Sequence, residues 1–526
     1  ACYAVQYKAI ARTQQHNDGE QGIIPVLSNR QMVTESQAMY VNGSGEKSYT
    51  IPSMTSSDSR EPRLLAVEFT ANPIWLAIQS LPYVSQHENP SNIYLFNQYF
   101  CNKVAQRIVE DNPSIKQVVA KWQSDSANAP KSRLSMNEDL KQTMMEETPW
   151  LQEAENEEQR IEEIANYFDQ ERINNELEQT ANKIKATQND DGGWSWIPDG
   201  EYSSVYTTRY MLRLMGSLTE QEARSLSSVI DNAMEYIDQQ AAKEYQHYKE
   251  HNIKDVVDAE FLYIHSCYPD IEVSENARAA YNYYMANAKK QCLDYTGLYS
   301  RAQLAIIMSR ADNDDLAEKL IKQLKECSLE SDEMGMYWRD NVSGFLWNER
   351  PIEEQAMLIK AFSEVTPDDS TSIALMRQWL LKQKQTTSWK SDIASVAAIT
   401  ALLEDTKPLN EGKPATLTVG QRTIETTAQA GTGYVAQRWK ASDITPDMNV
   451  VTIRQHNESI GWGAPYWQYV DDLENIESME MGISIKKSYL LIGADGKASE
   501  LRENSHVKVG DRVRVQLLVS CDRHLE

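Results

Sequence analysis

The period of the hydrophobic pattern changes twice along this chain, and that change limits the possible folds more than any single motif. Residues 1 to about 52 and about 408 to 526 alternate apolar and polar side chains, which is typical of strands with one buried face. Residues from about 60 to 405 instead repeat apolar side chains at helical spacing, as in RIEEIANYFDQERINNELEQTANKIKATQ. We therefore predict a multidomain α and β protein, with a helical region flanked by β-sandwich-type domains.

Tryptophan recurs in the turns of the helical region. The stretches DGGWSW (191–196), MYWRD (336–340) and TTSWK (386–390) each place a Trp in a turn before a helix of small and aliphatic residues. A recurring turn–Trp–helix unit indicates helical hairpins stacked side by side. Because the region shows no polar capping repeat, we expect the hairpins to close into an α/α toroid, a ring of paired helices.

Strand patterns occupy the two ends of the chain. Near the start, YAVQYKAIA, IIPVLSN, RQMVTESQAMYV and KSYTIPS are expected strands, with turns at NDGEQG and NGSGE. Several alternating segments after the helical region predict a β-sandwich. The predicted domains are a β-segment at 1–55, the toroid at 56–406 and a β-sandwich at 407–526. Strand patterns at both ends suggest that the chain is a piece of a longer protein.

The charge of the chain excludes two classes of partner. The formal net charge is −25 over 526 residues, whereas binding to nucleic acid requires clustered Lys and Arg. Anionic membrane surfaces attract basic segments in the same way. No stretch approaches the roughly 18 apolar residues of a membrane-spanning helix. We therefore expect no nucleic-acid partner and no insertion of these residues into a membrane.

No set of residues is spaced for catalysis or for holding a metal. The six cysteines include no CxxC pair, and HExxH, GxSxG and phosphate loops are absent. His247 and His251 are four residues apart in a densely charged helix, and we interpret them as a solvated face rather than zinc ligands. The run DNDD at 312–315 matches the acid motif of protonating cyclases, but its polar surroundings favour a helix start. We predict no catalytic residue, no metal and no cofactor.

The aromatic turns are expected to serve the architecture. Gln188, Gly192 and Trp194 fit QxxxGxW, a turn of helical-ring proteins in which paired glycines permit a tight bend. Large aromatic side chains dominate core burial, and this favours core packing over ligand platforms. The residues expected to be structural are Gln188, Gly192, Gly193, Trp194, Trp196, Trp462 and Trp467.

Three groups of segments occur along the chain in the order NRQMVTESQAMYVNGSGEKSYTI with VEFTANPIWLAIQSLPYV, EETPWLQEAENEEQRIEEIANYFD with DDGGWSWIPDGEYSSVYTTRYML, and AGTGYVAQRWK with IGWGAPYWQYVDDLENI. Together they resemble the C-terminal portion of the bacterial alpha-2-macroglobulin family. The resemblance implies that the helical region is the family's thioester-domain ring, with a CUB-like β-segment and macroglobulin β-sandwiches beside it. It also implies a place in the bacterial cell envelope.

In that family a thioester joins the Cys and the Gln of a CxEQ motif and links the molecule covalently to an attacking protease. A thioester needs a thiol at one end and a carboxamide carbon at the other. Aligned on LPY and on the downstream NxYxxN pattern, the four motif positions fall on Ser91, Asn92, Ile93 and Tyr94. Asn89 and Pro90 suit a helix start, and Cys101 has no Gln three residues later. We therefore predict that the helix is kept and the thioester is absent.

The resemblance implies an endopeptidase inhibitor that traps or binds proteases, here without covalent capture. Its partners would be endoproteases, or other domains of the same longer chain. Two alternatives remain open: a helical-toroid enzyme of the cyclase, lyase or glycosidase type, and a purely structural envelope scaffold. A deep aromatic cavity with two or more converging acids at the centre of the ring would favour the enzyme.

Overall fold

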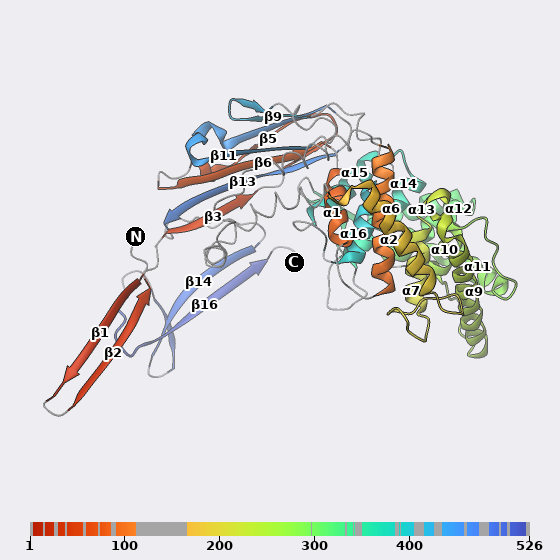
Figure 1. The fold of residues 1–526 in the computed structure, drawn as a ribbon, viewed down its shortest axis with the longest axis horizontal. Coiled ribbons are helices and arrows are strands. Elements are labelled where there is room, and N and C mark those ends of the chain that lie inside the picture. Colours follow the sequence, from red (N-terminus) through yellow and green to blue (C-terminus); the bar gives the residue numbers. More distant parts are fainter. Residues whose placement is uncertain are drawn as a thin grey trace.

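A computed structural model of the chain shows a helical part beside a set of β-sheets (Figure 1). The fold class predicted from the sequence is therefore confirmed. The structure describes residues 4–13, 16–25, 30–36, 39–55, 59–71, 74–85, 91–111, 166–295, 297–331, 334–339, 341, 350–383, 389, 391–403, 415–424, 434–456, 460–472, 483–493, 496–501 and 505–521.

The helices contact one another in a closed cycle. Within the described residues, α2 contacts α7, α7 contacts α10, α10 contacts α12, α12 contacts α14, α14 contacts α16, and α16 contacts α2 again. The helices between them in the chain lie outside this cycle. The helices are α1 (Ile74–Ser85), α2 (Asn92–Asp111), α6 (Gln170–Ala186), α7 (Val205–Met215), α8 (Glu220–Ala223), α9 (Ser227–Glu250), α10 (Ala259–Cys267), α11 (Arg278–Gln291), α12 (Leu298–Arg310), α13 (Asp314–Glu326), α14 (Pro351–Val365), α15 (Ser370–Lys382) and α16 (Asp392–Leu403).

The burial of neighbouring helices follows from this arrangement. Ten residues of inner helix α12 are buried, whereas only four residues of outer helix α13, of equal length, are buried. A helix with neighbours on several sides needs apolar side chains around most of its circumference, and an outer helix needs them on one face. The sequence of each helix therefore matches its place in the ring.

The three tryptophans expected in turns share one structural role, although Trp338 ends a strand, Gly335–Trp338, instead of lying in a turn. Each is fully buried and donates its indole N–H to the third-last carbonyl of the helix before it, namely in α6, α13 and α15. The last carbonyls of a helix have no partner within that helix, so the tryptophan satisfies one of them while joining an outer helix to the next inner helix. The bonds run from Trp194 to Ile184 (3.0 Å), from Trp338 to Leu324 (2.8 Å) and from Trp389 to Leu380 (2.8 Å).

Two sheets packed face to face form a β-sandwich. One has the strand order β10-β9-β12-β5, and the other has the order β11-β6-β13-β3, with β4 also pairing with β13. Buried side chains from both sheets form one cluster that includes Val67, Leu417, Ile453 and Trp467. The strands are β3 (Arg30–Ser36), β4 (Met39–Asn42), β5 (Gly45–Thr50), β6 (Glu61–Thr70), β9 (Thr416–Val419), β10 (Arg422–Ile424), β11 (Tyr434–Lys440), β12 (Val450–Gln455) and β13 (Ile460–Asp472).

Both ends of the chain contribute to this sandwich. Antiparallel β5 and β12 pair with Thr50 opposite Val450, and β13 lies between β6 and β3. The expected β-segment and part of the expected C-terminal sandwich therefore share one core, and the helices occur between them in sequence. The domain boundaries at residues 55 and 406 stay predictions.

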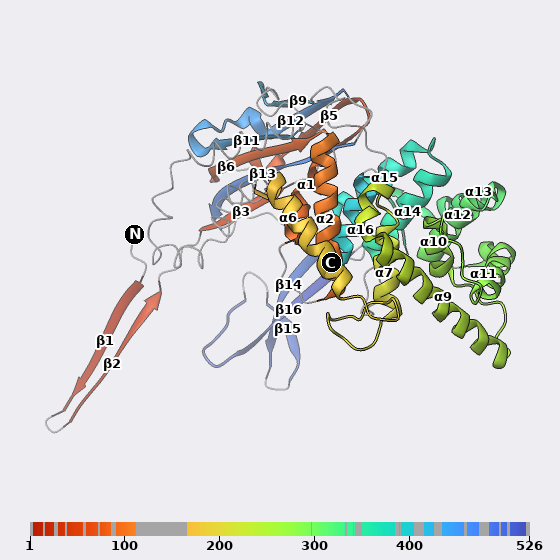
Figure 2. The ribbon, with the colours of Figure 1, turned by 45° about the vertical axis from the view of Figure 1, so that its right-hand side comes forward.

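Three further sheets among the described residues lie outside the sandwich. A long hairpin joins β1 (Ala4–Arg12) to β2 (Asn17–Pro25), and a separate sheet joins β14 (Ile483–Ile492) to β15 (Ala498–Glu500) and β16 (Arg512–Cys521). Figure 2 shows both extending away from the helices. A short hairpin of β7 (Ser328–Ser331) and β8 (Gly335–Trp338) precedes α14. None of the described helices has the length and apolar character needed to cross a bilayer.

Some local expectations were wrong. NDGEQG is not a turn but the first part of β2, in which Gly22 leaves room for the ring of Tyr7 on the opposite strand. Residues 61–70, within the range expected to be helical, form strand β6 because Leu65, Val67 and Phe69 point into the sandwich core. The sequence did not predict strand β13, because it contains Gly461 and Pro465, and glycine and proline seldom occur inside a strand.

Candidate functional site

The four positions that resemble a thioester motif lie at the first turn of α2. Ser91 precedes the helix, and its Oγ accepts a hydrogen bond of 3.1 Å from the backbone N–H of Tyr94. Its carbonyl accepts the first helical bond, from the N–H of Leu95, at 3.0 Å. Ser91 is therefore the N-cap of α2. The sequence predicted the helix correctly but assigned its start to Asn89 and Pro90, which lie outside the described residues.

The other side chains of this turn are fixed in place. Asn92 is fully buried, and its Nδ2 donates to the carbonyl of Ser195 at 2.9 Å. Ile93 belongs to the core of the ring. The hydroxyl of Tyr94 donates to the carbonyl of Ser85, at the end of α1, at 3.1 Å. The turn thus connects α1, α2 and the loop after α6 through hydrogen bonds and packing.

Neither end of a thioester is available at these positions. Ser91 offers a hydroxyl that is already used as a cap, and Tyr94 has no carboxamide carbon. The nearest cysteine in sequence, Cys101, is fully buried in α2, and burial raises the pKa of its thiol. A thiol held in its neutral form is a poor nucleophile.

The loop that holds Asn92 contains the QxxxGxW turn. Gln188 donates through Nε2 to the carbonyls of Gly192 and Val229, both at 2.8 Å, and so ties the turn to α9. Gly192 has a φ of +87°, and a Cβ there would lie 2.2 Å from the carbonyl oxygen of Asn232. No other residue type fits at this position without moving the backbone of α9.

The next residues of the same loop form an exposed aromatic patch, made of Trp196, Ile197, Tyr202 and Tyr206. These side chains are 52%, 59%, 84% and 36% exposed. The rings of Trp196 and Tyr206 stack with centroids 6.1 Å apart. Trp194 is fully buried, whereas Trp196, which was also expected to pack in the core, is half exposed.

The exposed aromatic patch adjoins the first turn of α2. The backbone N–H of Asn92 donates to the carbonyl of Trp196 at 3.1 Å. No Lys or Arg occurs between residues 188 and 206, whereas Asp190, Asp191, Asp199 and Glu201 are all exposed. The surface beside the first turn of α2 is therefore aromatic and acidic. The sequence did not predict this exposed patch, because a loop has no hydrophobic period that shows which side chains are buried.

The other candidate residues lie apart from this site. Trp467 is buried in the sandwich and stacks on Tyr469, whereas Trp462 stacks on Tyr40 and also packs against the helical core. Asp312 is exposed with a φ of 55°, and α13 starts at Asp314 as DNDD predicted, but the N-cap residue Asn313 makes no side-chain capping hydrogen bond, so the expected capping is not seen. His247 and His251 are close together on the exposed face of α9.

A cavity of about 80 Å³ lies between five of the inner helices. Three tyrosines line it, but Glu353 is the one carboxylate among the described residues that line it. The pattern that would favour a ring-centred enzyme, an aromatic cavity with two or more converging acids, is therefore incomplete here.

Comparison with protein-family models and with curated proteins finds no match to this sequence. Solved structures do match over 99% of the chain. One is native alpha-2-macroglobulin from Escherichia coli from domain MG7 to the C-terminus, with 13% identity, a TM-score of 0.43 and 70% of that chain covered. Others are the native conformation of the E. coli protein, with 12% identity and a TM-score of 0.43, and Salmonella alpha-2-macroglobulin reacted with methylamine, with 10% identity and a TM-score of 0.43.

All three structures are bacterial alpha-2-macroglobulins, the same family that the sequence segments resemble. It spans 28% of the E. coli chain and 29% of the Salmonella chain in the two longer structures.

Proposed function

We propose that this chain belongs to a macroglobulin-type protein of the bacterial cell envelope that binds or encloses an endoprotease without a covalent bond. The observation that carries the proposal is the first turn of α2. A capping Ser91 and a hydrogen-bonded Tyr94 stand where the resemblance places the two reactive groups. The helix and its surroundings are kept, while the chemistry for covalent capture is absent.

The exposed aromatic patch supports contact with the protease itself. Exposed Trp and Tyr side chains supply most of the binding energy at many protein interfaces. Trp196 and Tyr202 lie in the same loop as Ser195, whose carbonyl holds Asn92. The four exposed carboxylates around them favour a partner with a basic surface. A protease that reached this position would meet a non-covalent contact surface instead of a thioester.

The test mixes the protein that carries this chain with an endoprotease. We expect a complex on native gels that retains activity on small peptides and loses activity on large protein substrates. Boiling in denaturant should release the protease completely, and methylamine should not be incorporated, because no thioester exists. Cleavage without loss of activity on large substrates would contradict trapping, and a boiling-resistant adduct would contradict the non-covalent mechanism.

A variant pair locates the contact. Replacing Trp196 and Tyr202 together with Ala should weaken the complex by roughly 2 kcal/mol or more if they are central contact residues. The matched control is Leu329→Ala, at an exposed apolar side chain on β7. Equal affinity of the two variants, measured by titration of protease activity, would exclude the exposed aromatic patch as the contact surface.

A further inference from the structure

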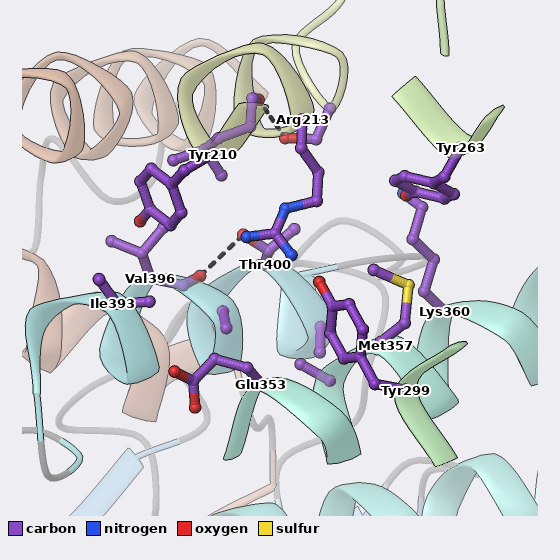
Figure 3. A pocket seen from close by; sticks show the side chains of 15 residues that line it. Tyr210, Arg213, Tyr263, Tyr299, Glu353, Met357, Lys360, Ile393, Val396 and Thr400 are labelled. Carbon is purple, nitrogen blue, oxygen red and sulfur yellow. Dashed lines mark hydrogen bonds between the residues drawn. The ribbon is translucent and has the colours of Figure 1, made fainter. Parts of the chain in front are cut away.

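The central cavity of the helical ring contains polar groups that the proposed function does not use. Its lining comes from α7, α10, α12, α14 and α16, so segments nearly 200 residues apart in sequence, from Tyr210 to Ala401, meet around it (Figure 3). A cavity needs roughly 10–15 Å³ of such space to hold one water molecule. With about 80 Å³, this cavity has room for a small organic molecule.

Arg213 is the main cationic group directed into the cavity. Its side chain is 17% exposed, and its closest carboxylate contact is Nε to Oε1 of Glu260 at 3.6 Å, which is longer than a hydrogen bond. Glu260 is itself held by Nε2 of Gln303. Within the described part of the chain, the guanidinium makes no hydrogen bond, and it lies near the rings of Tyr210 and Tyr299.

The hydroxyl of Tyr299 is a second group available to a ligand. The residue is 8% exposed, and its buried oxygen has no hydrogen-bond partner among the described residues. Figure 3 shows this oxygen directed toward the space beside the Arg213 guanidinium. A buried hydroxyl without a partner is unfavourable in a folded protein. A bound molecule that accepts its hydrogen bond would remove that cost.

The rest of the cavity wall is largely aliphatic. Met357 on α14 and Ile393, Val396 and Ala397 on α16 line it. Figure 3 shows Met357, Ile393 and Val396 around the same space as Arg213. Glu353 also lines the cavity, and burial raises the pKa of its carboxyl. A pocket with apolar walls and a few convergent donors is the usual form of a small-molecule site.

We propose that this cavity binds a small aliphatic monocarboxylate. The two Nη groups of Arg213 donate to its carboxylate oxygens, since a guanidinium fork matches that group. The hydroxyl of Tyr299 donates a third hydrogen bond. The aliphatic chain of the ligand packs against Met357, Ile393 and Val396. The limited volume favours branched chains of a few carbons over long fatty acids.

Isothermal titration calorimetry with isovalerate tests the site. We expect saturable binding to the whole chain, and no binding of the alcohol or amine of the same carbon skeleton, because neither supplies a carboxylate. Octanoate should also fail, since its chain exceeds the cavity. Absence of saturable isovalerate binding, or equal binding of the alcohol, would overturn the proposal.

Two variants separate a specific site from general carboxylate effects. Tyr299→Phe removes one hydroxyl and keeps the ring, and it should weaken isovalerate binding about tenfold or more. Arg213→Met should abolish binding. The controls are Tyr202→Phe and Arg278→Met, at side chains that are largely exposed and far from the cavity lining. If Arg213→Met does not fold, as judged by circular dichroism, Tyr299→Phe decides, and unchanged affinity in it contradicts the proposal.

Discussion

Ser91 is the residue at which α2 begins. Its hydroxyl satisfies the N–H of Tyr94, one of the donors that have no partner within α2. Serine is among the best capping residues and is chemically close to cysteine in size. Ser91 therefore starts the helix with a hydroxyl, which is not the thiol that a thioester requires.

We expect Ser91→Ala to destabilise the helical ring by about 1 kcal/mol, since a buried cap is lost and nothing replaces it. The measurement is the midpoint of chemical denaturation followed by the helical circular dichroism signal. Ser91→Thr keeps a capping hydroxyl and serves as the matched control. Identical midpoints for wild type and Ser91→Ala would show that Ser91 does not cap α2.

At the scale of elements, the recurring tryptophans connect each outer helix to the inner helix that follows. Trp194, Trp338 and Trp389 lie in different local sequences, yet each donates to the same position near the end of a helix. The period of helical hairpins was visible in the sequence for this reason. The tryptophan follows the accepting residue by 10, 14 and 9 positions, so the shared feature is the indole N–H at the helix end and not the length of the turn.

Replacing Trp338 with Phe should cost about 1 kcal/mol, because the buried carbonyl of Leu324 loses its 2.8 Å bond from the indole and keeps only the 3.3 Å bond from the N–H of Cys327. Thermal unfolding monitored by circular dichroism measures the loss. Trp196→Phe is the matched control, because that side chain is about half exposed and forms no indole hydrogen bond within the described residues. A cost for the control as large as that for Trp338→Phe would contradict the role assigned to the indole N–H.

On the scale of the whole molecule, the helices and the sandwich have separate cores. The buried cluster of the ring runs from Ala77 to Leu402, with Trp462 packed against it from outside. The cluster of the sandwich draws on residues before and after the ring, such as Phe69 and Leu417. The ring is thus independent in its packing, whereas the sandwich needs both flanks of the chain.

Excision tests this independence. We expect a fragment of residues 74–403 to keep its helical circular dichroism and to unfold cooperatively, because its core is complete. Residues 1–71 and 415–526, expressed separately, should each lack a folded sandwich, because β5 and β6 pair with β12 and β13. A non-cooperative ring fragment would refute separate cores, as would a cooperatively folded sandwich from one flank.

Local pattern was enough to predict much of this protein. Helical spacing predicted outer helices such as α13, whose buried residues recur three and four positions apart, whereas those of α12 cover most of the helix. The chemistry at Ser91 and Tyr94 also follows from residue type alone. Local pattern failed at β2 and β13, where glycine and proline suggest turns but cross-strand partners such as Tyr7 and Phe69 use the missing side-chain volume.

The sequence by itself determined most of the ring helices and several of the strands, and it fixed which residue types occupy the first turn of α2, Ser91 to Tyr94. Only the tertiary structure decided that β5 and β12 pair although the whole ring separates them in sequence. It also decided that Trp196 is exposed close to a buried Trp194, and that Arg213 and Tyr299 line one cavity. The physical reason is the separation in sequence between the residues that interact. Hydrophobic period and capping depend on residues a few positions apart, whereas strand pairing and cavities depend on how segments hundreds of residues apart pack together.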